Sequence, residues 1–264
     1  MERDGKKQAL STREARDLVA DAQRLLTQKL SGSSRRHFLR QGLTLGGVMM
    51  LTGCDLSDNP EAEQVLSAIS RVNDRVQGWL FSGNRRVPEY KESDITRPFP
   101  FNAFYGEESI PRVSGDDFRL HIRGLVRDSR DWTLAELNRL AQHEQITRHI
   151  CVEGWSAIGR WGGVRFSDFL RLIGADIRAK YVSFRCADDY YTSIDMASAL
   201  HPQTLLALSW DGRVLPAEYG YPMKLRIPTK LGYKNPKHII AIEITDRFTG
   251  GYWEDQGYNW FGGS

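Results

Sequence analysis

The sequence Thr147-Arg-His-Ile-Cys-Val-Glu-Gly-Trp-Ser156 places a cysteine, Cys151, where a short strand runs out into a loop. β-branched and apolar residues dominate 147–152, which predicts a strand, and Gly154 ends it. The glycines of Trp161-Gly162-Gly163 predict a further turn. A thiol held by rigid backbone on one side and open on the other can bind a soft metal or act as a nucleophile. The alternative is a buried structural cysteine that packs as a small apolar group.

The run Cys-Val-Glu-Gly-Trp-Ser resembles the molybdenum-binding segment of the sulfite oxidase family of molybdopterin enzymes. Two further segments match downstream in the expected order. They are Tyr181-Val-Ser-Phe-Arg-Cys186 and Pro222-Met-Lys-Leu-Arg-Ile-Pro-Thr-Lys-Leu-Gly-Tyr-Lys234, which runs on to Gly250-Gly-Tyr-Trp-Glu254. The resemblance covers roughly residues 77–263 and is greatest to the bacterial branch that includes the periplasmic methionine sulfoxide reductase catalytic subunit. It implies a sulfite oxidase-type molybdopterin-binding fold and a molybdenum-molybdopterin cofactor.

The composition fits one globular domain with additional segments, since the chain has 264 residues of which 41% are hydrophobic. No run of 18 or more apolar residues is present, so no ordinary membrane-spanning helix is predicted. Residues 1–54 hold ten Lys/Arg against five Asp/Glu, whereas residues 55–264 carry a balance of −2. A globular part without excess positive charge argues against nucleic acid as a partner. Three cysteines, Cys54, Cys151 and Cys186, do not suggest a disulfide scaffold.

The first 54 residues read as a leader followed by an export signal. Residues 1–33 are charged, with a capping box at Ser11 and apolar residues at helical spacing, which predicts a short amphipathic helix. A mobile charged leader is the alternative. Ser34-Arg-Arg-His-Phe-Leu-Arg40 and the apolar stretch that follows, within 34–54, predict a twin-arginine export signal.

Leu51-Thr-Gly-Cys54 resembles a lipobox, in which Cys54 would be lipidated, and Asp55 resembles the signal for retention in the inner membrane. A simple cleavage region is the alternative. Twin-arginine export carries folded proteins, which suits an enzyme whose cofactor is inserted in the cytoplasm. The predicted location is the periplasmic side of the inner membrane, with a lipid anchor.

The remaining chain divides into a helical linker at 55–85 and a single catalytic domain at 86–264. Within this domain we predict helices capped by Thr133, with Glu136, and by Ser167, with Gly174 as a stop. Alternation or β-branched content predicts strands at 118–122, 181–186, 190–194 and 238–245, and Asp211-Gly212 predicts a hairpin between 205–210 and 213–215. Because strands outnumber helices and do not alternate with long ones, the predicted class is α+β with mixed β-sheets.

A phosphate-bearing cofactor needs hydrogen-bond donors, and six basic residues crowd one short stretch: Lys224, Arg226, Lys230, Lys234, Lys237 and His238. A solvated basic face is the alternative. The resemblance assigns pterin contacts to Asn102, Tyr105, Cys186, Tyr219, Lys224, Asn235, Pro236 and Lys237. Three of these depart from the methionine sulfoxide reductase branch: Lys224 stands for Arg, Tyr219 for Asn and Cys186 for Thr.

The resemblance makes Cys151 the catalytic metal ligand, because thiolate is a soft donor that suits molybdenum. Glu153 and Trp155 follow closely and are expected to support it. The implied reaction is a two-electron oxygen-atom transfer on a small sulfur oxoanion or a sulfoxide. No Cys-x-x-Cys-His is present, so electrons are expected to pass through a separate haem or other redox partner at the membrane.

Two other functions stay open at this level. The first is an exported lipoprotein that binds a ligand or partner without catalysis. The second is a cysteine-nucleophile enzyme, for which His149, two residues from Cys151 on the same strand, would be the nearby base.

Overall fold

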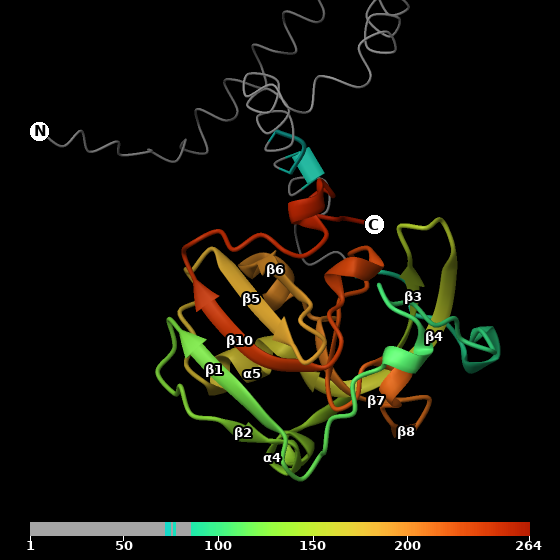
Figure 1. Cartoon of the computed structure of the whole chain (residues 1–264), viewed down its shortest axis with the longest axis horizontal. Helices are drawn as coiled ribbons and strands as arrows, with labels where there is room; N and C mark the ends of the chain where they lie inside the picture. The colour runs from blue at the N-terminus through green and yellow to red at the C-terminus, as the bar shows by residue number, and fades with distance from the viewer. Residues whose placement is uncertain (1–71, 75, 78–85) are drawn as a thin grey trace, which may run out of the picture. The chain divides into compact units, whose positions relative to one another are not determined.

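Two five-stranded β-sheets make up most of the regular structure that the computed structural model describes, in residues 72–74, 76–77 and 86–264 (Figure 1). The predicted leader at 1–33 and the export signal with Cys54 lie outside these residues. Of the helix predicted over the linker, residues 72–74 and 76–77 are described and are helical. No helix in the described part of the chain has the length and apolar character needed to cross a membrane.

The first sheet has the strand order β2-β1-β10-β5-β6. Strands β1 and β10 pair in parallel and the other neighbours pair antiparallel, so the sheet is mixed, as predicted. Alternate residues point into one core, and Leu120, Ile122 and Phe184 are fully buried there. The strands are β1 (Arg119–Gly124), β2 (Trp132–Thr133), β5 (Tyr181–Cys186), β6 (Tyr191–Asp195) and β10 (Ile239–Thr245).

The second sheet has the order β3-β4-β7-β8, with β9 paired to β7, and all of its pairings are antiparallel. Its longest element is the β3–β4 hairpin, whose loop carries Cys151. The hairpin predicted at Asp211-Gly212 is confirmed, and both residues have positive φ as its turn requires. The strands are β3 (Gln142–Ile150), β4 (Ser156–Arg165), β7 (Leu205–Trp210), β8 (Arg213–Val214) and β9 (Lys224–Arg226).

The turn predicted from Trp161-Gly162-Gly163 is wrong, because these residues lie inside β4. The glycines are there for a different reason: the pairing of β4 with β7 shifts register between them. A Cβ on Gly163 would lie 1.9 Å from the Leu206 carbonyl oxygen. Glycine inside a strand thus marks a bulge and a close backbone approach at this point.

Three short α-helices flank the sheets: α4 (Leu134–Arg139), α5 (Phe166–Leu172) and α6 (Met196–Leu200). The capping box of α4 is confirmed, since Thr133 Oγ1 accepts from the Glu136 N–H and a Glu136 carboxylate oxygen accepts from the Thr133 N–H. The cap predicted at Ser167 is wrong. Helix α5 already begins at Phe166, whose N–H donates to the Thr204 carbonyl and whose ring is buried in the first core.

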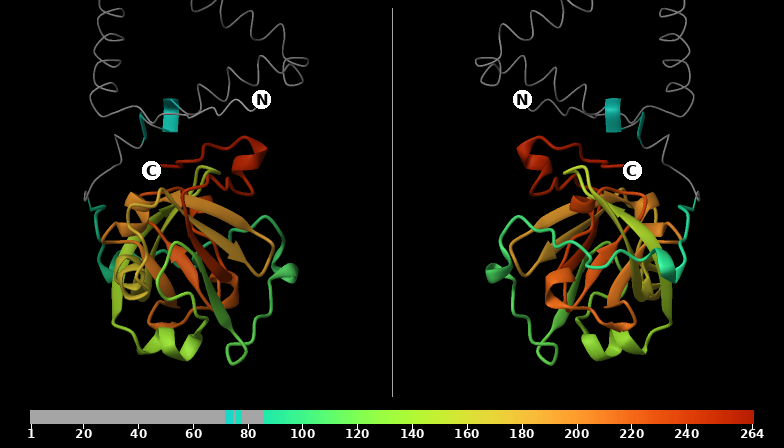
Figure 2. Two further views of the ribbon diagram at one scale, coloured as in Figure 1. Left: turned by 90° about the vertical axis from the view of Figure 1, so that its left-hand side faces the viewer. Right: turned by 90° about the vertical axis from the view of Figure 1, so that its right-hand side faces the viewer.

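Short 3-10 turns and extended chain connect these elements: η1 (Glu92–Asp94), η2 (Glu107–Ser109), η3 (Ala217–Tyr219), η4 (Gly232–Lys234) and η5 (Glu254–Gln256). Figure 2 shows the segment after β10, which carries η5, at the same end of the domain as the β3–β4 loop. These two regions and η4 surround the cavity described next.

Candidate functional site

A cavity opens beside Cys151, between the β3–β4 loop, the chain around η4 and the C-terminal segment. It contains about 750 Å³ of empty space, its open mouth included. Of the nine residues predicted to bind cofactor or metal, six line it: Asn102, Cys151, Lys224, Asn235, Pro236 and Lys237. Residues as far apart in the sequence as Asn102 and Lys237 therefore meet where the motifs predicted a single site.

Cys151 begins the hairpin loop, directly after β3 ends at Ile150, and not within the strand as predicted. Its N–H donates to the Trp155 carbonyl over 2.9 Å, and its own carbonyl accepts from the Gly154 N–H over 3.2 Å. Gly154 has a φ of 93°, a conformation that favours glycine. The loop backbone thereby fixes the position of the thiol at the cavity wall.

The Cys151 thiol is 3.7 Å from a carboxylate oxygen of Glu153, and the same oxygen accepts from the Trp155 indole N–H over 2.8 Å. Burial raises the pKa of the thiol, and the neighbouring carboxylate adds to this effect. An activated cysteine nucleophile needs the opposite shift, or a base in contact with the sulfur. His149 does not supply that base, because neither of its ring nitrogens makes a hydrogen bond in the described structure. This geometry disfavours the cysteine-nucleophile alternative.

Two buried ammonium groups, those of Lys224 and Lys237, face the cavity. Within the described residues neither forms an ion pair with a carboxylate; Lys237 Nζ donates to the Glu218 carbonyl, and Lys224 Nζ lies 4.9 Å from the centre of the Trp161 ring. Burial and repulsion from Lys237 and Arg226 lower the pKa of Lys224, and burial lowers the pKa of Lys237 to about 8. Buried positive charge that forms no ion pair within the described residues fits an anionic ligand such as a phosphate.

Arg226 holds the cavity wall together, a role that the sequence did not single out from the basic cluster. Its guanidinium donates to the Asn235 side-chain oxygen over 3.1 Å and, on the other side, to Thr147 Oγ1 and the Arg148 carbonyl over 3.1 and 2.6 Å. The Asn235 oxygen also accepts from the Ile227 N–H over 2.8 Å. Arg226 thus ties β3 to the chain that presents Asn235, Pro236 and Lys237.

Three predicted contact residues do not line the cavity. Tyr105 lies behind it and donates its hydroxyl to Asp188, a cavity residue, over 2.9 Å. Cys186 is buried in the core of the first sheet. Tyr219 packs against Trp210 and donates to the Phe99 carbonyl over 2.8 Å.

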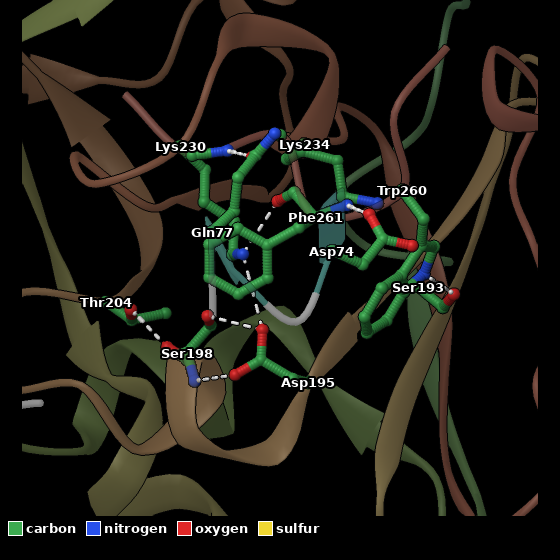
Figure 3. A network of polar contacts seen from close by, with 12 residues as sticks. Asp74, Gln77, Ser193, Asp195, Ser198, Thr204, Lys230, Lys234, Trp260 and Phe261 are labelled. Carbon is green, nitrogen blue, oxygen red and sulfur yellow. Dashed lines mark hydrogen bonds and ion pairs between the residues drawn. The ribbon is translucent and has the colours of Figure 1, made fainter. Parts of the chain in front are cut away.

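The other lysines of the basic cluster do not line the cavity and contact protein groups instead; Figure 3 shows Lys230 beside Asp195 and Phe261. Lys230 Nζ donates to the Phe261 carbonyl over 2.7 Å and lies 3.3 Å from Asp195, and buried Lys234 pairs with Glu254. These contacts join η4 to the C-terminal segment, which brings Trp253 and Tyr258 to the cavity. The sequence pattern could not separate these anchoring lysines from Lys224 and Lys237, because that distinction depends on where Asp195 and Glu254 fold.

Aromatic side chains form a further part of the wall, and the sequence assigned them no role. Tyr233 and Trp253 lie within the matching segments but were not predicted as contacts; the aromatic residues that line the cavity are Phe104, Tyr190, Tyr233, Trp253 and Tyr258. The cavity thus combines one thiol, two buried cations and an apolar aromatic wall. This donor set fits a ligand that has an anionic end, a flat polar ring system and a soft metal.

Comparison with known proteins agrees with this chemistry. A family model described as the oxidoreductase molybdopterin binding domain matches residues 107–253. A protein of Azospira oryzae, provisionally named protein-methionine-sulfoxide reductase subunit YedZ1, is 64% identical over 231 residues, which cover 88% of each chain. The protein-methionine-sulfoxide reductase catalytic subunit MsrP of Xanthomonas axonopodis is 27% identical over 83% of this chain and 73% of that one.

Among solved structures, the sulfane dehydrogenase SoxCD from Paracoccus pantotrophus aligns with a TM-score of 0.49 and 23% sequence identity. The alignment covers 52% of this chain and 40% of the SoxCD chain.

Proposed function

Since the chain belongs to the molybdopterin-binding oxidoreductases of the sulfite oxidase family, we propose that it reduces a sulfoxide at the cavity beside Cys151. The family assignment makes it an enzyme with a molybdopterin cofactor and confirms the predicted fold class. We propose, in addition, which residues form the site and which class of substrate they act on. One observation carries it: the cavity brings together the Cys151 thiol and two buried lysines that form no ion pair with a carboxylate among the described residues.

In this proposal Cys151 is the protein ligand of the molybdenum, and Lys224 and Lys237 hold the anionic end of the cofactor. Asn102, Asn235 and Pro236 line the space between them. When bound, the cofactor supplies two-electron redox chemistry for oxygen-atom transfer. The chain orients it: Arg226 fixes Asn235, and the loop closed by Trp155 and Gly154 fixes the thiol.

The charges beside Cys151 favour a neutral sulfoxide over a sulfur oxoanion. A Glu153 carboxylate oxygen lies 3.7 Å from its sulfur, and Asp188 adds a second carboxylate to the cavity. Lys224 and Lys237 are assigned to the cofactor, so an anionic substrate would meet negative charge without a cation of its own. The Azospira relative, by its name a subunit of a protein-methionine-sulfoxide reductase, supports the same substrate class.

The aromatic wall suits this substrate. Phe104, Tyr233, Trp253 and Tyr258 offer apolar surface against which the alkyl groups of a sulfoxide can pack. The overall conversion consumes two electrons and two protons, yields a thioether and releases water. The electrons come from a separate redox partner.

The proposal includes export and membrane attachment. The twin-arginine pattern at 34–54 would carry the folded, loaded protein across the inner membrane, and lipidation at Cys54 would hold it on the periplasmic side. A haem protein at the membrane would then supply electrons. Fractionation of cells that express the full chain, followed by mass spectrometry of the N-terminal peptide, tests both the location and the lipid.

The catalytic proposal is tested with the full chain purified from cells in which the export route is active. We expect about one molybdenum per chain, and turnover of methyl sulfoxides with a reduced viologen dye but little oxidation of sulfite. A metal-free and inactive protein would support the non-catalytic lipoprotein instead. Turnover of sulfite that matches that of sulfoxides would overturn the substrate assignment and leave the cofactor assignment standing.

A further inference from the structure

The inward face of β3 is polar, which is unusual for a strand that is buried on that side. Alternate residues Gln145, Thr147 and His149 point inward and lead to Cys151. The Gln145 amide donates to the Gln203 carbonyl over 2.9 Å, and Thr147 Oγ1 accepts from Arg226 over 3.1 Å. His149 is the member of this row whose side chain makes no hydrogen bond in the described structure, at either ring nitrogen.

His149 packs against Gly232, a residue of the cavity wall, and does not itself line the cavity. Its side chain is almost fully buried, with 1% of the residue exposed, and its ring packs against those of Phe99 and Trp155 at centre-to-centre distances of 6.3 and 5.8 Å. Its Nε2 atom is 2.9 Å from the point where a Cβ on Gly232 would stand. The same point is 3.4 Å from the Asn102 amide nitrogen. Gly232 and Asn102 both line the cavity.

A buried imidazole with two unpaired nitrogens is costly, and folded proteins leave few such groups. Within the described residues its neighbours supply no hydrogen-bond partner: the imidazole packs on the rings of Phe99 and Trp155. The nearby charged groups are the cations Lys224, Arg226 and Lys237. The lack of a side chain at Gly232 leaves space between Nε2 and the amide nitrogen of Asn102, a residue that lines the cavity. A ligand in the cavity is then the natural partner.

We infer that His149 is a binding residue for the pterin cofactor and that Nε2 is the contacting atom. The inference rests on the proposed function and adds to it a residue that the motif comparison did not assign. A pterin carries both N–H donors and carbonyl or ring-nitrogen acceptors, and an imidazole nitrogen can meet either kind according to its tautomer. His149, Asn102 and Cys151 then contact the ligand from one wall, and Lys224 and Lys237 bind its charged end.

The test compares His149→Gln, His149→Asn and His149→Leu in the loaded full-length protein. A Gln amide reaches the position of Nε2, whereas an Asn amide reaches that of Nδ1. Two readouts do not depend on turnover: molybdenum per chain, and pterin released and oxidised to its fluorescent form. We expect His149→Leu and His149→Asn to lose cofactor about tenfold faster than wild type on dilution, as the loss of one hydrogen bond implies, and His149→Gln to stay within about threefold.

Gln145→Leu is the matched control, because Gln145 lies on the same strand face and its amide is already bonded by the protein. It should leave the cofactor content per folded chain unchanged. Apo-protein from cells grown without molybdate gives a second measurement: His149→Leu removes an unpaired polar group, so its melting temperature should equal or exceed that of wild-type apo-protein.

Cofactor retention by His149→Leu equal to that of wild type would overturn the inference. So would equal losses in all three variants together with a lower melting temperature of the apo-protein, since that pattern indicates a packing role. Wild-type protein that carries no pterin would overturn the proposed function, and the inference with it. Retained pterin and molybdenum in wild type, with no effect at His149, would overturn the inference alone.

Discussion

The guanidinium of Arg226 donates to the side-chain oxygen of Asn235 over 3.1 Å, and this contact holds the chain that lines the cavity at Asn235. The same guanidinium holds Thr147 and the Arg148 carbonyl on β3. Cys151 is three residues beyond Arg148, and Lys237 two beyond Asn235. One buried side chain therefore sets the distance between the proposed metal ligand and the proposed phosphate-binding lysine.

Replacing Arg226 should loosen both β3 and the chain that carries Asn235. Arg226→Met leaves the Arg148 carbonyl and Asn235 without their buried donor, and we expect a loss of about 2–4 kcal/mol in the free energy of unfolding together with low molybdenum content. Arg226→Lys should rescue little, because an ammonium cannot reproduce the forked contacts. Thr147→Val removes a single contact and should cost about 1 kcal/mol. Urea titrations measure whether the losses of stability follow this order. An Arg226→Met protein with the stability and the molybdenum content of wild type would contradict the prediction.

Binding of an anion should depend on pH through Lys237. Burial lowers the pKa of this side chain to about 8, so in the ligand-free protein its charge is lost as the pH rises through 8. An anion favours the charged form, so binding takes up protons and the affinity should fall above pH 8, by at most about tenfold per pH unit for each such lysine. Calorimetry of apo-protein with inorganic pyrophosphate measures this. Lys237→Gln should bind more weakly at pH 7 and show a shallower pH dependence, and exposed Lys180→Gln is the control.

The same depressed pKa has a consequence for stability without ligand. Lys237 has its ordinary pKa of 10.5 in the unfolded chain and about 8 in the folded one, so the unfolded chain binds more protons between these values. The contribution of Lys237 to stability therefore becomes less unfavourable as the pH rises from about 8 to 10.5. Wild-type and Lys237→Gln apo-proteins should differ in this slope. Identical slopes, or affinity for pyrophosphate that rises with pH, would contradict the assignment.

The buried pair of Lys234 and Glu254 should be sensitive to the loss of one partner. Glu254→Gln leaves the Lys234 ammonium buried without a counter-charge, and we expect a loss of about 3–5 kcal/mol in unfolding free energy. Because this pair joins η4 to the C-terminal segment, protease cleavage after residue 250 should also become faster. Arg178→Ala, which breaks the exposed pair with Asp176, should change neither measurement noticeably. Equal behaviour of the two variants would show that the pair does not anchor the segment.

Gly163 should tolerate no side chain. A Cβ there would lie 1.9 Å from the Leu206 carbonyl oxygen, so Gly163→Ala must separate β4 from β7 and should cost about 3 kcal/mol or more. Gly212→Ala is the control, because its φ of 73° imposes strain but nothing lies within 4 Å of the added methyl; about 1 kcal/mol is expected. Thermal unfolding measures both. A Gly163→Ala protein that melts with wild type would refute the close strand approach.

Local chemistry made much of the fold predictable. The strand predicted from Tyr181 to Cys186 is β5, Asp211-Gly212 forms the predicted hairpin turn, and Thr133 with Glu136 forms the predicted capping box, because each depends on neighbours in sequence. Strand β4 was missed for the opposite reason. Gly162 and Gly163 carry turn propensity, and it is the approach of β7, some 40 residues later, that requires glycine inside a strand.

The site residues also divide into those that the sequence predicted and those that it could not. The motif resemblance located Cys151, Lys224 and Asn235, which the fold brings to one cavity. It could not indicate that Arg226 would hold Asn235, nor that His149 would lack a hydrogen-bond partner among the described residues, because both facts depend on which groups the two sheets bring together. Burial of a polar residue on an alternating strand face is a usable signal, and the row Gln145, Thr147, His149 shows it.

X-ray absorption at the molybdenum edge, on purified wild type and Cys151→Ser, tests the central claim most directly. We predict that wild type binds about one molybdenum per chain and that its sulfur coordination number exceeds that of any metal retained by Cys151→Ser, while the pterin is still detectable in the variant. Wild-type protein without molybdenum, or a metal whose sulfur coordination is the same with and without the Cys151 thiol, would contradict the account.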